Sequence, residues 1–470
     1  MTVSNDFKLK RYIIKINIYD KIDIIETVKE DLNMKRLFII SSLILLLTGC
    51  SGEKTEDSPD KLNMKDEYTA IKNFVDREME LRKGKLELVD SDEGISAVKD
   101  IDINGDGENE KIVTYSVGTD QKTLHFMILK RQSDTYSVVK DVSFRGEDID
   151  KIYIEDLTFN GKKDIIINST EGNSKILTVY AFENDIEKLL EIDYSTYVVE
   201  DIDGNKNIDF IIFKNIGDIL STDYYRYNND TKKIEFVNEN INYINMKNIA
   251  KPEVENITKN RKGVVLQGND GNVQRYTLLF GIDENGKLEN MIKDSTEEGS
   301  SLTAHVSIED PNFRAEDIDD DGILDIPRIY LMIEEDEGFV MNRDSYITCV
   351  EWFNLKNSKL ERKESLIYLE DDRVYFKKPK NWEDVEITGI KRKSSSGIEY
   401  SFSKRDPESS GKEDLMTILK TNKTPDSSYE LIKKDGENSY YIKVEDKISF
   451  EKLRPFKVDE NYIIKNFFIE

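Results

Sequence analysis

The sequence predicts a mainly β protein, with about five propeller-like repeats between an N-terminal helix and a small C-terminal α+β region. Three observations favour this fold. Short acidic segments recur along the chain, and each leads into an apolar, strand-like run. The chain has 23 Tyr and 20 Phe but only 8 Pro, which is typical of strands rather than of disorder. The spacing of the acidic segments, near 40–60 residues per unit, is typical of β-propeller blades.

Segment 34–49 has the features of a secretory signal peptide. Basic residues Lys35 and Arg36 precede the mostly apolar run 37–47, which is far shorter than the roughly 20 apolar residues that span a bilayer. The run ends in Leu-Thr-Gly-Cys50, which resembles the lipobox of bacterial lipoproteins. This resemblance implies that Cys50 is lipidated and that the protein is anchored at the extracytoplasmic face of the cell membrane.

The segments on either side of the signal peptide have different expected roles. Residues 1–33 carry several acidic side chains, which do not fit a signal peptide, so we expect them to be an over-called upstream extension, with Met34 as the natural start. The polar segment 50–62 is expected to be a tether. Segment 63–95 should form a helix over 66–83, followed by lead-in strands. We expect this helix to pack on the core through Ile71, Phe74, Val75, Met79 and Leu81.

Charge and cysteine content limit the classes of function. The formal net charge is −26, and residues 1–49 carry more basic than acidic groups, so the remainder is more acidic still. Such a chain repels phosphate backbones, and we expect no nucleic-acid partner. Beside Cys50 the chain has only Cys349, so no intramolecular disulfide is expected once Cys50 is lipidated.

The repeats are predicted to cover residues 96–366. The first to fourth acidic loops, as we call them, occupy 102–110, 156–164, 201–209 and 317–325. A decayed copy at 256–264 fills the wide gap before the fourth loop, which makes five units of roughly 55 residues. A non-closed β-solenoid of tandem hairpins is the alternative to propeller blades. In the first unit, four strand-like runs follow the loop: 112–116, 124–129, 136–142 and 149–154.

The four loops share a nine-residue pattern that suits Ca²⁺. The first position is Asp, the third and fifth are mostly Asp or Asn, glycine falls at the sixth or fourth, and the ninth is Asp or Glu. Ca²⁺ takes six to eight hard oxygen ligands in a flexible arrangement. An EF-hand is rejected, because its twelfth position needs Glu and here holds Val113 or Arg328, and strand-like runs follow instead of helices.

The loops and their spacing resemble the FG-GAP/VCBS family, whose β-propeller blades carry Ca²⁺ loops of this form, as in integrin α-subunits. The resemblance implies two to four structural Ca²⁺ sites. The fourth loop is the strongest candidate, the second offers only two charged ligands, and the decayed copy should bind no metal. The expected ligands are Asp102, Asn104, Asp106, Glu108, Glu110, Asp156, Asn160, Asp164, Asp201, Asp203, Asn205, Asn207, Asp209, Asp317, Asp319, Asp321, Ile323 and Asp325.

Residues 367–470 break the repeat period and are predicted to form a small α+β domain. The segment ending Pro379-Lys-Asn-Trp382, followed by strand-like runs, is faintly similar to PsbP-like domains. We expect Trp352 and Trp382 to be core residues and Cys349 to be an inert buried thiol.

Motifs for enzyme chemistry are scarce. The chain has two histidines, both within strand-like runs, and no nucleophile elbow, zinc-protease motif or phosphate loop. The leading hypothesis is therefore a non-enzymatic, membrane-anchored scaffold that binds a protein or glycan. A propeller hydrolase or lyase acting on polysaccharide through paired carboxylates is the alternative. A transporter-linked solute-binding protein fits less well, because no alternating strand-helix pattern is visible.

Overall fold

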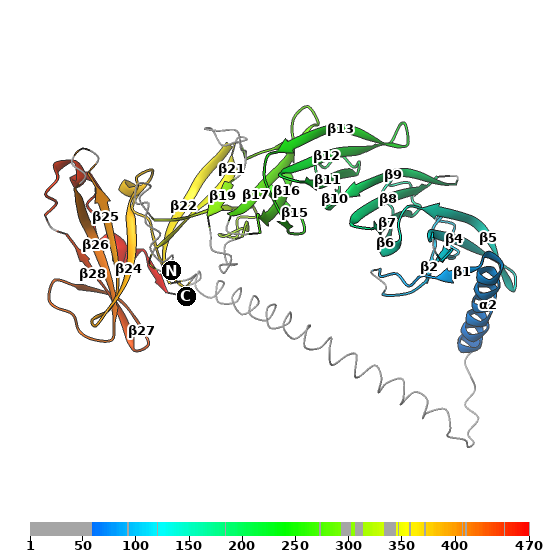
Figure 1. Cartoon of the computed structure of the whole chain (residues 1–470), viewed down its shortest axis with the longest axis horizontal. Coiled ribbons are helices and arrows are strands. Elements are labelled where there is room, and N and C mark those ends of the chain that lie inside the picture. Colours follow the sequence, from blue (N-terminus) through cyan, green and yellow to red (C-terminus); the bar gives the residue numbers. More distant parts are fainter. Residues whose placement is uncertain are drawn as a thin grey trace, which may run out of the picture. The chain divides into compact units, whose positions relative to one another are not determined.

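Strands dominate the chain, which confirms the predicted mainly β fold (Figure 1). The computed structural model describes residues 59–469, except 92–93, 120, 184, 272–273, 293–301, 306–313, 333–344, 346, 357–358, 371–372, 407, 409–410 and 446. The upstream extension, the signal peptide and Cys50 lie outside the described residues. No helix in the described part of the chain is both long enough and apolar enough to cross a membrane.

Helix α2 (Pro59–Arg82) begins inside the segment expected to be a tether. Proline suits a first helical turn, because its missing N–H has no partner there. Phe74, Val75 and Met79 are buried against the first sheet, as expected. Leu81 is instead 71% exposed. It follows Met79 by two residues, about 200° around the helix, and so lies off the buried stripe.

Five successive antiparallel sheets follow the helix. Sheet I comprises β1 (Gly84–Leu86), β2 (Val98–Ile101), β3 (Glu110–Val117), β4 (Thr123–Gln132) and β5 (Thr135–Phe144). Sheet II comprises β6 (Asp148–Glu155), β7 (Asp164–Glu171), β8 (Ser174–Phe182) and β9 (Ile186–Tyr194). Sheet III comprises β10 (Thr196–Glu200), β11 (Asp209–Ile216), β12 (Ile219–Asn228) and β13 (Lys233–Asn242).

Sheets IV and V continue the series. Sheet IV comprises β14 (Asn248–Ile249), β15 (Glu253–Thr258), β16 (Arg261–Asn269), β17 (Gln274–Ile282), β18 (Leu288–Asn290) and β19 (Leu302–His305). Sheet V comprises β20 (Ile326–Leu331), β21 (Thr348–Lys356), β22 (Lys359–Glu370), β23 (Val374–Lys377) and the C-terminal β29 (Phe467–Ile469). The sheets therefore form five propeller-like units, in agreement with the repeat pattern.

Each of the first three acidic loops joins two antiparallel strands that pair with each other in one sheet. The first loop lies between β2 and β3, the second between β6 and β7, and the third between β10 and β11. The fourth loop is flanked by a bridge between Glu316 and Asp325 and leads into β20. Sheets II and III thus begin one strand before their loop, and sheet I begins two strands before its loop. The run 149–154, expected to close the first unit, instead opens sheet II as part of β6.

Neighbouring sheets pack face to face, and their inner strands are buried on both sides. In β7, Ile165 and Ile167 pack against sheet I, whereas Ile166 packs against sheet III. In β11, Ile212 faces sheet II and Ile211 faces sheet IV. Because alternate side chains of a strand point to opposite faces, burial on both faces requires an unbroken apolar run. This explains why each acidic loop is followed by consecutive apolar residues.

The C-terminal region is joined to the last repeat. Sheet VI comprises β24 (Thr388–Ser394), β25 (Gly397–Arg405), β26 (Lys412–Thr421), β27 (Glu430–Asp435) and β28 (Asn438–Val444). The helical elements of this region are η2 (Lys380–Trp382), η3 (Glu451–Phe456) and α3 (Glu460–Lys465). The predicted domain boundary at 366/367 falls inside β22, and β29 returns to pair with β23 in sheet V. The two regions therefore share a sheet.

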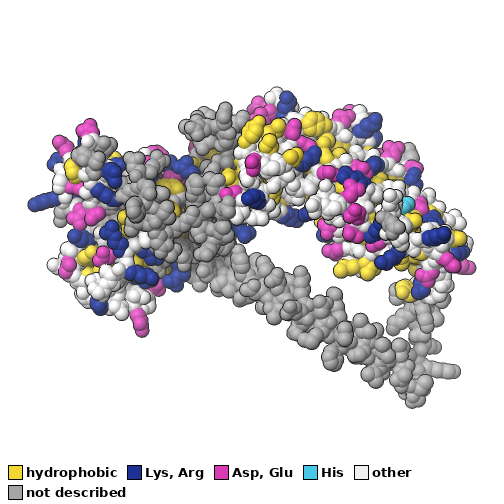
Figure 2. Space-filling view, in the orientation of Figure 1, with side chains coloured by type: hydrophobic (Ala, Val, Ile, Leu, Met, Phe, Trp, Pro, Cys, Tyr) yellow, Lys and Arg dark blue, Asp and Glu magenta, His cyan; other side chains and the backbone are white. Residues whose placement is uncertain are grey.

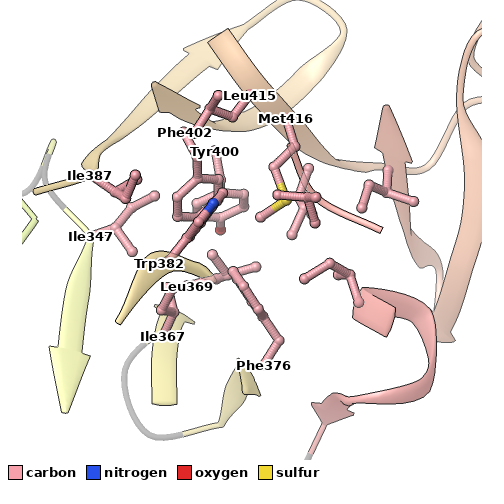
Figure 3. Packing of buried hydrophobic residues seen from close by; sticks show 14 of the residues in the cluster. Ile347, Ile367, Leu369, Phe376, Trp382, Ile387, Tyr400, Phe402, Leu415 and Met416 are labelled. Carbon is pink, nitrogen blue, oxygen red and sulfur yellow. The ribbon is translucent and has the colours of Figure 1, made fainter. Parts of the chain in front are cut away.

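One apolar core spans sheet V and sheet VI (Figure 3). Trp382 is fully buried in it against Phe402, and its indole N–H donates to the Phe456 carbonyl at 2.8 Å. Trp352 is 3% exposed in a second cluster of sheet V. Both tryptophans are core residues, as expected from the sequence.

Candidate metal and ligand sites

All four acidic loops adopt the same backbone conformation. Their fourth and sixth positions have positive φ in every loop, a region that favours glycine and costs other residues energy. In the third loop glycine occupies the fourth position and lysine the sixth, and both residues nevertheless have positive φ. The fourth and sixth positions, with φ, are Gly105 (74°) and Gly107 (87°), Phe159 (52°) and Gly161 (81°), Gly204 (74°) and Lys206 (66°), and Asp320 (61°) and Gly322 (80°).

The same hydrogen bonds hold each loop. The first-position Asp accepts the sixth-position amide at 2.8–3.0 Å. The fifth side chain accepts the seventh-position amide at 2.7–2.9 Å. The ninth carboxylate accepts the second-position amide at 2.9–3.2 Å. The carboxylates at the first and ninth positions therefore stabilise each loop by accepting its backbone amides. This also holds for the second loop, which has the fewest charged candidate ligands.

The ninth position is buried in every loop. Asp164, Asp209 and Asp325 have no exposed surface, and Glu110 is 2% exposed. Burial disfavours the charged form and raises the pKa of all four carboxyl groups. A buried carboxylate needs either hydrogen-bond donors or a cation beside it.

The third position determines where carboxylates converge. In the third loop, Asp201, Asp203 and Asp209 bring carboxylate oxygens within 4.8 Å of one another, and Asp317, Asp319 and Asp325 do so in the fourth loop. The first and second loops have Asn104 and Thr158 at the third position, and neither supplies a carboxylate there. The acidic groups of the third and fourth loops could hold a metal ion.

The fifth and seventh positions contribute differently from the first, third and ninth. The fifth residues Asp106, Asn160, Asn205 and Asp321 already accept an amide within their own loop. They are not members of the two converging groups. In the first loop, the side-chain amide of Asn104 donates a hydrogen bond of 2.9 Å to the carboxylate of Glu110, the ninth residue. The predicted roles of Glu108, Asn207 and Ile323 at the seventh position stay predictions.

Three of the loops receive a basic side chain from another strand of their own sheet. Lys130 of β4 lies 2.6 Å from Asp106 in the first loop. Arg226 of β12 lies 2.8 Å from Asp203 and 3.2 Å from Asp209 in the third. Lys363 of β22 lies 2.7 Å from Asp319 and 3.1 Å from Asp325 in the fourth. The motif search missed these partners, because they lie far from the loops in sequence.

A groove of about 590 Å³ lies beside the second and third acidic loops. It runs across sheets II, III and IV, and its sheet IV side is the decayed copy, which forms a short turn between β15 and β16. Phe159, at the fourth position of the second loop, lines the groove and is 58% exposed. Polar side chains provide much of the remaining lining, among them Glu155, Glu200, Asp203, Asn260 and Lys262.

Phe159 is unusual at its position. The equivalent residues of the other loops are Gly105, Gly204 and Asp320, which tolerate positive φ better than a bulky aromatic residue. Strained backbone that carries an exposed side chain is concentrated at functional sites. The sequence does contain a signal for this residue, namely an aromatic residue at a position where the sibling loops have Gly or Asp.

Comparisons with known proteins give no family. No protein-family model matches the chain, and no curated protein sequence does. Among solved structures, a protein from Lactobacillus plantarum aligns over 65% of this chain and 81% of its own, with 10% identity and a TM-score of 0.26. The exotype rhamnogalacturonan lyase YesX aligns over 77% and 74%, with 10% identity and a TM-score of 0.25. A functionally unknown protein from Desulfotomaculum acetoxidans aligns over 62% and 76%, with 8% identity and a TM-score of 0.24.

Proposed function

We propose that this chain is a membrane-anchored, extracytoplasmic scaffold that binds a glycan through the groove beside the second and third acidic loops. Its anchor would be lipid on Cys50. Ca²⁺ would bind at the third and fourth acidic loops, and at the third loop it would stiffen one side of the groove. The observation that carries the proposal is the exposed, positive-φ Phe159 at this groove.

The groove has the chemistry of a site for a hydroxyl-rich ligand. Binding sites combine an apolar or aromatic surface with a few fixed polar groups. Here Phe159 supplies the aromatic face, and Glu155, Asn260 and the ion pair of Glu200 with Lys262 (2.6 Å) supply acceptors and donors. Acidic residues outnumber basic ones along the lining, so an uncharged or amino-bearing glycan suits it better than an acidic one.

The surface supports recognition by a local site rather than by a broad charged face. Acidic and basic side chains are interspersed on the visible face of the described residues (Figure 2). The formal net charge of −26 still disfavours nucleic acid as a partner. Ca²⁺ held by Asp201, Asp203 and Asp209 would neutralise and stiffen the third loop, of which Asp201 and Asp203 line the groove.

Binding of the purified full-length chain to immobilised cell-envelope glycans tests the groove. Phe159→Gly should weaken binding at least tenfold, because it removes the aromatic face and leaves the loop with the residue its siblings use. Phe236→Ala is the matched control, since Phe236 is 57% exposed on β13. Equal glycan binding by wild type and Phe159→Gly would contradict the proposal, and capture of a protein alone would replace the glycan by a protein partner.

The anchor has its own test. Cells expressing the chain should incorporate a palmitate analogue into it, and Cys50→Ala should abolish that labelling. Stable anchoring would need more than one acyl chain, as a single chain binds membranes only marginally. Labelling that persists in Cys50→Ala would remove the anchor from the proposal.

A polysaccharide hydrolase or lyase is the second candidate, because Glu155 and Glu200 line the same groove. Paired carboxylates are the groups that glycosidases use. New reducing ends released from envelope polysaccharide, and lost in Glu155→Gln or Glu200→Gln, would establish this enzyme in place of the scaffold.

A further inference from the structure

We propose that Lys130, Arg226 and Lys363 are tethered cations that neutralise the acidic loops, and that in the third and fourth loops, where carboxylates converge, the side chain and a divalent ion are alternative occupants. This inference goes beyond the proposed function, because it assigns the loops a metal-free state with a built-in counterion and names the residues that set their metal affinity.

The fourth acidic loop shows the arrangement most fully. The Lys363 ammonium group lies 2.7 Å from an Asp319 oxygen, 3.1 Å from both Asp325 oxygens and 3.4 Å from Asp321. Asp319 and Asp325 are also two of the three carboxylates that converge in this loop. Ca²⁺ would need the same oxygens at about 2.3–2.6 Å. An ammonium group and a metal ion therefore exclude each other from this position.

The chain directs Lys363 into the loop by a β-bulge. Strands β21 and β22 pair Trp352 with Glu364 and Phe353 with Arg362, which leaves Lys363 as the extra residue between them. A bulge redirects the side chain of its extra residue. The lysine thus reaches a carboxylate group 38 residues away in sequence.

The first and third loops reach a similar result from a different strand. Asp209 pairs directly with Arg226 across β11 and β12. Continuing the register of β3 and β4 places Lys130 opposite Glu110, the ninth residue of the first loop. The Lys130 ammonium group lies 3.6 Å from the Glu110 carboxylate, beside its shorter contact with Asp106. Basic residues facing the ninth carboxylate are therefore a repeated feature of the sheets.

The second loop differs from the other three, because its buried ninth carboxylate, Asp164, is neutralised without a basic side chain. The register of β7 and β8 places Ala181 opposite Asp164, where no basic side chain is available. Asp164 instead accepts three backbone amides, those of Leu157, Thr158 and Phe182, at 2.9–3.2 Å. Where the tethered cation is missing, backbone donors satisfy the buried carboxylate.

The tethered cation should lower the affinity of its loop for metal, because a metal must displace it. Lys363 has a flexible stem, whereas Arg226 has a planar guanidinium group that holds Asp203, Asp209 and the Tyr224 hydroxyl together. We therefore expect the fourth loop to exchange its occupant more readily than the third.

The test uses the purified full-length chain and the Lys363→Met variant, which keeps an unbranched stem of similar length but removes the charge. Lys356→Met is the matched control, since Lys356 is exposed and pairs only with Glu361 among the described contacts. Melting temperatures are measured in EDTA, and Ca²⁺ affinity is measured by calorimetric titration. We expect Lys363→Met to melt several degrees lower in EDTA, to bind Ca²⁺ at least tenfold more tightly than wild type, and to regain wild-type melting with Ca²⁺.

Two results would overturn the inference. One is wild-type melting of Lys363→Met in EDTA, which would show that the lysine neutralises nothing. The other is an unchanged Ca²⁺ affinity in a protein that binds Ca²⁺, which would show that the two cations do not compete. If neither protein binds Ca²⁺, the metal part of the proposed function fails, and the EDTA comparison alone decides whether Lys363 acts as the counterion.

Discussion

The second and fourth acidic loops have the same backbone and the same closing hydrogen bonds, yet they neutralise their buried carboxylates in different ways. Asp164 of the second loop accepts three backbone amides. Asp325 of the fourth accepts one, from Ile318, and faces the Lys363 ammonium group. Loop conformation and loop electrostatics are therefore separate properties of these repeats. A conserved turn geometry does not imply a common occupant, and each loop needs its own test.

The largest expected effect is on the second loop. Asp164→Ala would leave three backbone donors without their acceptor, two of them in fully or nearly fully buried residues. Each unsatisfied buried donor costs about 1–3 kcal/mol, so the free energy of unfolding should fall by roughly 3–5 kcal/mol. Urea denaturation in EDTA and in Ca²⁺ measures it. We expect the same loss in both, and a loss below about 1 kcal/mol would contradict the role given to these amides.

Ca²⁺ should stabilise the folded protein through the fourth loop and not through the second. An ion that binds only the folded state adds about 2.7 kcal/mol at a hundredfold excess over Kd. The double variant Asp317→Asn with Asp319→Asn should remove the gain that comes from the fourth loop, because these residues supply two of its three converging carboxylates. Asp156→Asn in the second loop is the control. If EDTA leaves the melting curve of the wild-type protein unmoved, the metal assignment is wrong.

Substitutions at the fourth loop position can distinguish the energetic cost of positive φ from the contribution of the Phe159 side chain to binding. Because its φ is 52°, Phe159→Gly should raise the free energy of unfolding by about 1 kcal/mol while glycan binding falls. Gly204→Ala is the converse change at the same position of the third loop. A Cβ there meets nothing within 4 Å, and φ is 74°, so only the backbone cost, about 1 kcal/mol, should appear. Loss of stability in Phe159→Gly would contradict the claim that Phe159 is strained.

The smallest expected effect is on the chemical reactivity of Cys349, which lies in sheet V, the sheet that follows the fourth loop. Burial raises the pKa of its thiol to about 11, so little reactive thiolate forms at neutral pH. Peptide mapping after treatment with a thiol reagent should find Cys349 unmodified in the folded protein. In Lys363→Met with EDTA, modification should become measurable if the loop loosens the sheet. Rapid labelling of the wild-type protein would contradict the burial of this thiol.

Several features of the fold could be predicted because they are local. The helix, the strands and the acidic loops follow from short patterns of apolar, acidic and glycine residues, and five repeats correspond to five sheets. The pattern assigned the run 149–154 to the first unit rather than to sheet II, since the second loop separates β6 from its partner β7. It also placed a domain boundary at 366/367, where the repeat period ends. It could not show that β29 pairs with β23, because about 90 residues separate the two strands in the chain.

The repeated acidic loops and the apolar strands that follow them can be predicted from the amino-acid sequence, as can a candidate lipid anchor, because each depends on residues adjacent in the chain. Which carboxylates converge is a property of the folded chain, since it depends on two positive-φ positions and on the residue at the third position. The fold likewise brings Lys363 to Asp325 and places Phe159 and Glu200 along the same groove. Charge balance and binding surfaces arise from contacts between distant segments, and a linear motif does not record those contacts.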